Sequence, residues 1–433
     1  MGGSASESAV PTGIAFGPRP RSELPPARPT RKIRSFACRL PGLLAASLLY
    51  AVSASATPGV TLDAIVFGQS AGLSGPNEWL GIHYRAGILA AFGESNSQGG
   101  VDGRRLELIA LDDRYEPEHA AANAERFVAE NDVLAVVGGV GTPTAARIAP
   151  VLRTAGIPFI GHVTGADFLH DAGRFPNVVN LRASYLDEVR TLVEHIVAES
   201  GHRRTRAMAA DGARMGIIYQ DDAFGRSVMR SYLKALAEHG IPLLAKTAYS
   251  RNTHAVHASL FGLAKADLDA ILLVGTYSAN GEIINLANSL GHDYTMANLS
   301  FAVSYELRRI VETPSDRILV TEVVPSPHDP DSALAASFRR AMDSFPTPGG
   351  AAVNELSLEG YLLGRYLVST LTRMDGIYTR ESFMTHAKPR EPVRIDDWTV
   401  AFDPGSNAGS SYVRLTHLQS GQAVAESLGE KAR

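Results

Sequence analysis

The sequence predicts an α/β protein with two lobes, each built on a parallel central sheet. Its 433 residues exceed what one hydrophobic core usually organises, so two lobes are expected. From Val60 onward, short β-rich runs alternate with longer amphipathic segments, which is typical of parallel sheets covered by helices on both faces. With 45% hydrophobic and 20% charged residues, the composition is that of a globular protein and excludes a disordered chain.

Residues 1–56 are predicted to be a leader that is removed on export. A stretch rich in Pro, Gly, Ser and Arg precedes a basic cluster, an apolar run over Leu40–Val52 and the small residues Ala54-Ser55-Ala56. This order is typical of a secretory signal peptide cleaved after Ala56. The apolar run is too short to cross about 30 Å of hydrocarbon as a membrane anchor. We therefore expect a periplasmic protein.

Removal of the leader makes the chain more acidic. The leader contains seven Lys and Arg but only two Asp and Glu residues, so the formal net charge moves from −4 to −9. An acidic surface disfavours binding to nucleic acid or an anionic membrane. The single cysteine, Cys38, is lost with the leader, which excludes disulfides and thiolate metal sites from the mature chain.

The alternation of elements can be followed along the chain. Strands are predicted at Thr61–Phe67, Leu106–Leu111, Leu134–Val137, Pro158–Ile160, Met215–Tyr219, Leu243–Thr247, Ala270–Val274, Trp398–Phe402 and Ser411–Leu415. Helices are predicted at Trp79–Phe92, Glu118–Glu130, Thr144–Thr154, Tyr185–Glu199, Phe224–His239, Asn280–Leu290, Ser332–Ser344 and Leu356–Met374. Residues 201–214 are polar and are interpreted as an exposed connection.

Open parallel sheets bind ligands beyond the carboxyl ends of their strands, so the loops after the strands are the candidate site. Thr142 and Thr144 follow a Gly-rich turn at the start of a predicted helix, where a hydroxyl either caps the helix or binds a ligand. Adjacent Asp112 and Asp113 point to opposite faces of a strand, which favours a turn or cap over a metal or acid–base pair. His254 and His257, three residues apart, could share a helix face and bind a metal, but no third ligand lies nearby in the sequence, so a solvated face is the better interpretation.

Six motifs in order resemble the leucine/isoleucine/valine-binding protein family, which comprises type I periplasmic binding proteins of ABC transporters. The most distinctive is an Asn-x-x-Gly-Gly-x-x-Gly turn followed by Asp-Asp within Ser95–Ala120. The others are LSGPNEW at Leu73–Trp79, GTPTA at Gly141–Ala145, NLRASYLDE at Asn180–Glu188, YQDDAFG at Tyr219–Gly225 and SLEGY at Ser357–Tyr361.

This resemblance implies two Rossmann-like lobes joined by a three-segment hinge, and no catalysis. Lobe one would comprise residues 57–181 and 323–397, and lobe two residues 184–320 and 402–430. The protein would be a monomer without cofactor or metal that captures a small solute by hinge closure and delivers it to an ABC permease in the inner membrane.

The resemblance also implies ligand-binding residues. In the family, a Ser or Thr at the position of Thr142 or Thr144 and a second Thr, here Thr164, bind the ligand carboxylate, and a backbone carbonyl at the position of His162 accepts from its ammonium. Trp79 matches an aromatic wall of the pocket. Further aromatic candidates, for which core packing is the alternative, are Tyr185, Phe224 and Tyr277.

One position departs from the family pattern. Amino-acid-binding members have a Glu three residues after the Tyr of the VGTYSANG segment, and here that position is Asn280. A neutral amide cannot form the charge-assisted bond that stabilises a buried ammonium. We therefore expect a carboxylate, amide or aromatic acid in place of a branched-chain amino acid.

Two other functions remain open at the level of sequence. The same fold serves in sensors that report a ligand to a signalling partner. An exported α/β enzyme would need a nucleophile with a base or an acid–base pair, and the sequence does not assign one.

Overall fold

The computed structural model describes residues 57–203, 213–345, 347, 349–419 and 423–426. The predicted leader and most of the predicted connection at 201–214 lie outside these ranges. Among the described residues, none of the helices combines the length and apolar character needed to cross a membrane.

The first sheet contains five parallel strands in the order β2-β1-β3-β4-β5. They are β1 (Ala64–Ala71), β2 (Arg105–Asp112), β3 (Ala135–Val137), β4 (Phe159–Ile160) and β5 (Val178–Val179). Strand β1 begins and ends later than the predicted Thr61–Phe67 because its bounds follow its pairing: it is an interior strand that pairs with β2 along its whole length and with β3 at Phe67 and Gly68.

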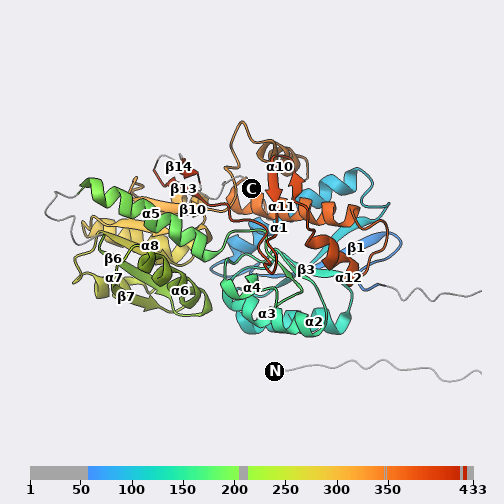
Figure 1. The fold of residues 1–433 in the computed structure, drawn as a ribbon, viewed down its shortest axis with the longest axis horizontal. Coiled ribbons are helices and arrows are strands. Elements are labelled where there is room, and N and C mark those ends of the chain that lie inside the picture. The colour runs from blue at the N-terminus through green and yellow to red at the C-terminus, as the bar shows by residue number, and fades with distance from the viewer. Residues whose placement is uncertain (1–56, 204–212, 346, 348, 420–422, 427–433) are drawn as a thin grey trace, which may run out of the picture. The chain divides into compact units, whose positions relative to one another are not determined.

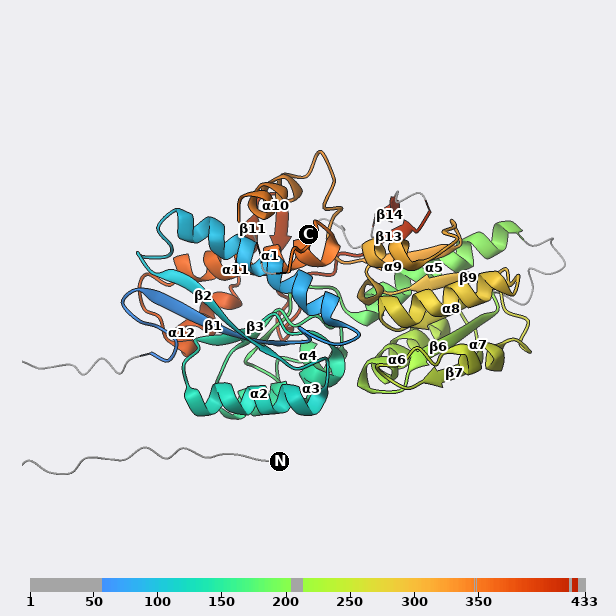
Figure 2. The ribbon, with the colours of Figure 1, turned by 180° about the vertical axis from the view of Figure 1, so that it is seen from behind.

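Helices cover both faces of this sheet (Figures 1 and 2). They are α1 (Glu78–Ser97), α2 (Pro117–Glu130), α3 (Thr142–Thr154), α4 (Asp167–His170), α10 (Ala333–Ser344), α11 (Glu355–Thr372) and α12 (Arg380–Ala387). Helices α2 and α3 lie on one face, and α1 and α11 on the other. Helices α1 and α11 approach closely because Gly87 has no side chain. A Cβ at this position would lie 1.9 Å from the Ser357 carbonyl oxygen. We call this sheet with its helices lobe one.

The second sheet has seven strands in the order β14-β13-β10-β9-β8-β6-β7. They are β6 (Met215–Gln220), β7 (Leu243–Tyr249), β8 (Ala270–Val274), β9 (Thr295–Asn298), β10 (Ile318–Glu322), β13 (Arg414–His417) and β14 (Ala423–Glu426). Neighbours from β7 to β10 are parallel, whereas β13 and β14 add antiparallel pairs. Strand β8 has the predicted bounds.

The helices of the second sheet connect its strands, except for the first, which leads from β5 into β6. They are α5 (Tyr185–Arg203), α6 (Ala223–Glu238), α7 (His257–Leu263), α8 (Tyr277–Ser289), the short 3-10 helix η2 (Ser300–Ala302) and α9 (Ser304–Ile310). We call this sheet with its helices lobe two. A separate hairpin pairs β11 (Val393–Ile395) with β12 (Trp398–Val400).

The chain passes between the two sheets three times, after β5, after β10 and after β12. The first and third passages are hydrogen-bonded to each other: the Asn180 N–H donates to the Asn407 carbonyl at 2.8 Å, and the Gly409 N–H donates to the Asn180 carbonyl at 2.8 Å. The predicted α/β class with two parallel-rich sheets is confirmed.

Candidate functional site

In both sheets the strand order reverses beside the first strand, which marks the ligand-binding edge. Strand β1 lies between β2 and β3, and β6 lies between β7 and β8. Ligands of open parallel sheets bind beyond the carboxyl ends of the strands at this reversal. Trp79 and Thr142 follow β1 and β3, whereas Phe224 and Tyr277 follow β6 and β8. The predicted residues therefore gather at the expected edges.

Three buried hydroxyls form what we call the hydroxyl ring. Thr142 Oγ1 lies 2.7 Å from Thr164 Oγ1 and 3.0 Å from the Tyr185 hydroxyl, and Thr164 Oγ1 lies 3.1 Å from the same hydroxyl. None of the three residues is more than 1% exposed. The ring lies at the start of α3, and Tyr185 is the first residue of α5.

Thr144 and His162 support the turn beside the ring. The Thr144 hydroxyl lies 2.8 Å from the Gly141 carbonyl oxygen, and His162 Nε2 lies 2.8 Å from the same oxygen. Burial lowers the pKa of His162 to about 3, so its ring is neutral near pH 7. The His162 carbonyl already accepts the Thr164 N–H at 2.8 Å. The His162 carbonyl oxygen therefore keeps one lone pair that can accept a hydrogen bond from a ligand.

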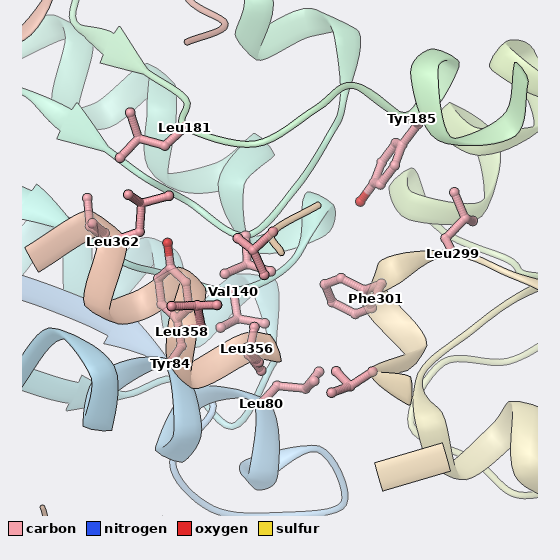
Figure 3. Packing of buried hydrophobic residues seen from close by; sticks show 14 of the residues in the cluster. Leu80, Tyr84, Val140, Leu181, Tyr185, Leu299, Phe301, Leu356, Leu358 and Leu362 are labelled. Carbon is pink, nitrogen blue, oxygen red and sulfur yellow. The ribbon is translucent and has the colours of Figure 1, made fainter. Parts of the chain in front are cut away.

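Apolar groups from both lobes meet next to the ring. The Phe224 ring centroid lies 5.4 Å from that of Tyr185 and 4.9 Å from that of Phe301. Figure 3 shows Tyr185 and Phe301, on the lobe-two side, facing Val140 and Leu356 of lobe one. The surroundings of the ring therefore suit the apolar body of a ligand.

Trp79 belongs to an aromatic cluster that also joins the lobes. Its ring stacks on His83 at 3.7 Å between centroids and meets Tyr277 edge-on at 5.9 Å. The Tyr277 hydroxyl donates to the Pro76 carbonyl of lobe one at 3.0 Å. Burial lowers the pKa of His83 to about 4, so this cluster is uncharged near pH 7.

Asn280 is buried in lobe two, and its hydrogen bonds are made to strands of that lobe. Its Nδ2 donates to Asn298 Oδ1 at 2.9 Å and to the Leu273 carbonyl at 3.3 Å, which ties the start of α8 to β8 and β9. Its Oδ1 has no hydrogen-bond partner among the described residues. The structure thus gives the amide a role in joining strands.

A narrow polar pocket at the carboxyl ends of β6, β7 and β8 was not predicted. Asn77 of lobe one closes the pocket and is 4% exposed. Its Nδ2 donates to Asn252 Oδ1 at 2.8 Å, whereas its Oδ1 has no hydrogen-bond partner within the described chain. The lining comprises Pro76, Asn77, Gln220, Tyr249, Asn252, Thr253, His254, Thr276, Ser278 and Ala279. The position of Gln220 and Thr276 at the ends of predicted strands was the available signal.

A polar contact between the lobes, which we call the interlobe clamp, was also missed. Arg251 of lobe two donates to the Tyr115 carbonyl at 2.7 Å and pairs with the Glu116 carboxylate of lobe one. Asn252 Nδ2 donates to the same carboxylate at 2.5 Å. Nothing in the sequence pairs residues that are so far apart in the chain.

The first passage between the sheets contains a buried ion pair. Arg182 Nε lies 3.5 Å from Glu359 Oε1, and both side chains are nearly inaccessible. Burial raises the pKa of Glu359, and the charge of Arg182 opposes this rise. Glu188 accepts from the Ser300 N–H at 2.8 Å and from the Thr321 hydroxyl at 2.6 Å.

The structure explains the acidic and histidine pairs noted in the sequence. Asp112 accepts from the Leu73 N–H and Asp113 from the Tyr115 N–H, both at 2.8 Å, so both carboxylates stabilise turns. Helix α7 begins at His257, so His254 is not on that helix. Within the described residues, no group of three or more His, Cys, Asp or Glu could hold a metal ion.

A Gly-x-Ser-x-Gly pattern at Gly68–Gly72 does not form a nucleophile elbow. Such an elbow requires an exposed Ser at a sharp strand-to-helix turn. Here Ser70 lies within β1, is 1% exposed and donates to Asp113 Oδ2 at 2.8 Å. This serine is therefore structural.

Comparisons with known proteins agree with this architecture. A model of the periplasmic binding protein family matches residues 64–418. Leu/Ile/Val-binding protein homolog 7 of Brucella abortus is 24% identical over 297 residues, which cover 68% of this chain and 72% of the relative.

Solved structures are also similar. A possible leucine/isoleucine/valine-binding protein from Rhodopirellula baltica is 33% identical with a TM-score of 0.75, covering 86% of this chain and 98% of that one. A fatty acid ABC transporter substrate-binding protein from Thermomonospora curvata has a TM-score of 0.77 at 17% identity, covering 87% and 95%; at that identity the likeness shows the fold alone. The chain belongs to the periplasmic binding protein family, whose members bind solutes and are not enzymes.

Proposed function

We propose that this protein is the periplasmic substrate-binding component of an ABC uptake transporter of the branched-chain amino acid type. It captures a small solute with a carboxylate or amide head group and an apolar body. The motif pattern of the sequence and the name of the Rhodopirellula baltica relative support the transporter type. The predicted signal peptide supports the periplasm.

The hydroxyl ring beside apolar groups is the observation that favours this function most. Thr142 and Thr164 lie at the switch point of lobe one, where a polar head group can be bound. The apolar surroundings formed by Phe224, Phe301 and Val140 suit a hydrocarbon or aromatic body. Such a division, with a few polar groups in an apolar setting, is typical of small-molecule sites.

The site offers little to an α-ammonium group. Asn280 is neutral and binds Asn298. Asp222, an acidic residue that follows β6, accepts from the Phe224 N–H at 2.8 Å and from Gln220 Nε2 at 2.6 Å, so its carboxylate caps α6. These features favour a solute that lacks the amino group.

Hinge closure is the proposed mechanism of capture. Lobe one, residues 57–181 and 323–397, would hold the head group, while lobe two, residues 184–320 and 402–430, would close over the body. Contacts made only in the closed form select that form when the ligand binds. The interlobe clamp would stabilise the closed form, which a membrane permease would then recognise.

A thermal-shift screen followed by calorimetry tests this function. Amino acids, short and aromatic carboxylates and their amides are compared, because a bound ligand raises the melting temperature. Thr142→Ala and Thr164→Ala should each weaken binding of a hit by about 1–3 kcal/mol, since a polar group of the ligand loses its partner.

Thr154→Ala is the matched control, because the Thr154 hydroxyl lies in the last turn of the same helix and donates to the Pro150 carbonyl at 2.9 Å, away from the ring. Unchanged affinity in both ring variants would refute the assignment of the site. Micromolar binding of leucine to the wild type would refute the argument against an ammonium.

A further inference from the structure

We propose that Tyr185 makes the site select a neutral amide head group over a carboxylate, because its hydroxyl closes the ring with Thr142 and Thr164. This inference rests on the proposed function and narrows its solute class. It follows from the number of protons in the ring, from the anchoring of Tyr185 and from the charges around it.

The hydroxyl protons of Thr142, Thr164 and Tyr185 can all be used within the ring. Three hydroxyls have three protons, and the three oxygen–oxygen distances of 2.7, 3.0 and 3.1 Å allow each proton to serve one bond of the ring. A carboxylate has only acceptors, so a ring hydroxyl can donate to it only by giving up one of these buried bonds. The hydroxyl oxygen that accepted that proton then loses its donor, which is costly where water is excluded.

An amide can bind without breaking the ring. Each hydroxyl oxygen in the closed ring keeps one lone pair. The remaining lone pair of Thr164 Oγ1 accepts the Ala166 N–H at 3.3 Å. Thr142 and Tyr185 therefore remain able to accept the N–H of a ligand amide, and that amide's oxygen can take a backbone N–H elsewhere in the loops.

Tyr185 is the first residue of α5 of lobe two, and its backbone is anchored to lobe one in this structure. Its backbone N–H donates to the Gly165 carbonyl at 2.8 Å, and a Cβ on Gly165 would lie 2.6 Å from that nitrogen. Phe224 packs on its ring. The hydroxyl is thus held close to both threonines in the form that the structure describes, so a ligand that enters this form meets the complete ring.

The surroundings do not compensate a carboxylate. Pro143 has no N–H, so the first turn of α3 offers one donor fewer to an anion. His162, buried beside the ring, is neutral near pH 7. The charge of Arg182, which acts on Tyr185, is already opposed by the carboxylates of Glu359 and Glu188, and Arg182 donates to Ser300 Oγ at 2.5 Å, while its Nε and Nη1 have no hydrogen-bond partner among the described residues.

The test compares acids with their amides in the purified protein. Dissociation constants are measured by calorimetry at pH 7 for isovalerate and isovaleramide and for phenylacetate and phenylacetamide. The wild type should bind each amide at least about threefold more tightly than its acid. Tyr185→Phe opens the ring and frees one threonine proton, so it should shift this ratio toward the acid by about three- to tenfold, the equivalent of one hydrogen bond.

Tyr366→Phe is the matched control, because Tyr366 is equally buried and its hydroxyl donates to the Ala387 carbonyl at 2.8 Å, far along the chain from the ring. An acid preference in the wild type would overturn the inference, and this measurement needs no variant. An unchanged ratio in a folded Tyr185→Phe protein would also overturn it. If neither the isovaleryl nor the phenylacetyl compounds bind, while Thr142→Ala weakens binding of a solute of another class, the amide preference is refuted and the proposed binding function stands. If no solute binds at all, the amide preference and the proposed function are both refuted.

Discussion

Replacing Arg182 by Met should strongly destabilise the protein, because the change leaves a carboxylate buried without its cation. The Arg182 and Glu359 side chains are 2% and 7% exposed, and their closest atoms are 3.5 Å apart. Methionine keeps much of the length of the arginine stem but neither its charge nor its bond to Ser300 Oγ. The loss therefore reports the charge and its hydrogen bond more than packing.

The expected cost is about 3–5 kcal/mol in the free energy of unfolding at pH 7, the range for removing one partner of a buried ion pair. Burial already raises the pKa of Glu359 even with Arg182 present. Without the arginine, Glu359 can take up a proton, and the cost of protonation limits the loss. The same substitution at the exposed pair of Arg105 and Glu107, which are 70% and 43% exposed, should cost at most about 1 kcal/mol.

Urea unfolding at pH 7 measures these differences for Arg182→Met and for Arg105→Met as the control. The double variant Arg182→Met, Glu359→Met should recover at least half of the loss, since a pair replaced by apolar residues leaves no buried charge. A loss below about 1 kcal/mol for Arg182→Met, or no recovery in the double variant, would refute the reasoning.

Two further predictions concern pH and closure. Burial raises the folded-state pKa of Asp113 to about 6, above its usual 3.8. The stability that its protonated form contributes is therefore fully present below pH 3.8 and is lost as the pH rises through 6. The difference in pKa corresponds to about 3 kcal/mol of unfolding free energy. Asp113→Asn should therefore lower the pH dependence of the unfolding free energy between pH 4 and 7, and an unchanged dependence would contradict the assignment. Arg251→Ala removes the contacts of the interlobe clamp to Tyr115 and Glu116 that the arginine makes. Dissociation of every bound solute should become faster by a similar factor, about three- to thirtyfold, in stopped-flow measurements. Arg226→Ala, which alters only an exposed pair with Asp221, is its control, and equal off-rates in the two variants would contradict a closing role.

Periodicity in the sequence predicted the regular elements best where they are long or fully apolar. The all-apolar segment Ala270–Val274 matches β8 residue for residue. In contrast, β5 has two residues and β9 reads Thr-Met-Ala-Asn, so neither has a pattern that distinguishes it from a loop. Their pairing in the sheet, and not their own propensity, makes them strands.

The candidate site could be predicted only in part. Thr142 was found because it follows a strand of the first sheet and Thr164 because the family resemblance implied it, and the structure brings them within hydrogen-bond distance. Tyr185 was predicted as an aromatic wall, but its hydroxyl role needs the third distance of the ring. The interlobe clamp was not predictable, because exposed polar loops show no periodicity that pairs them.

The sequence by itself determined the α/β alternation, the family motifs and the position of the hydroxyls after their strands, because these depend on residue type and local spacing. Only the tertiary structure decided how the polar groups are used. It closed Thr142, Thr164 and Tyr185 into a ring, turned Asn280 toward β9, and joined Glu116 to Arg251. A hydrogen-bonding group selects its partner by distance and burial, and both are set by chain segments that the local sequence does not bring together.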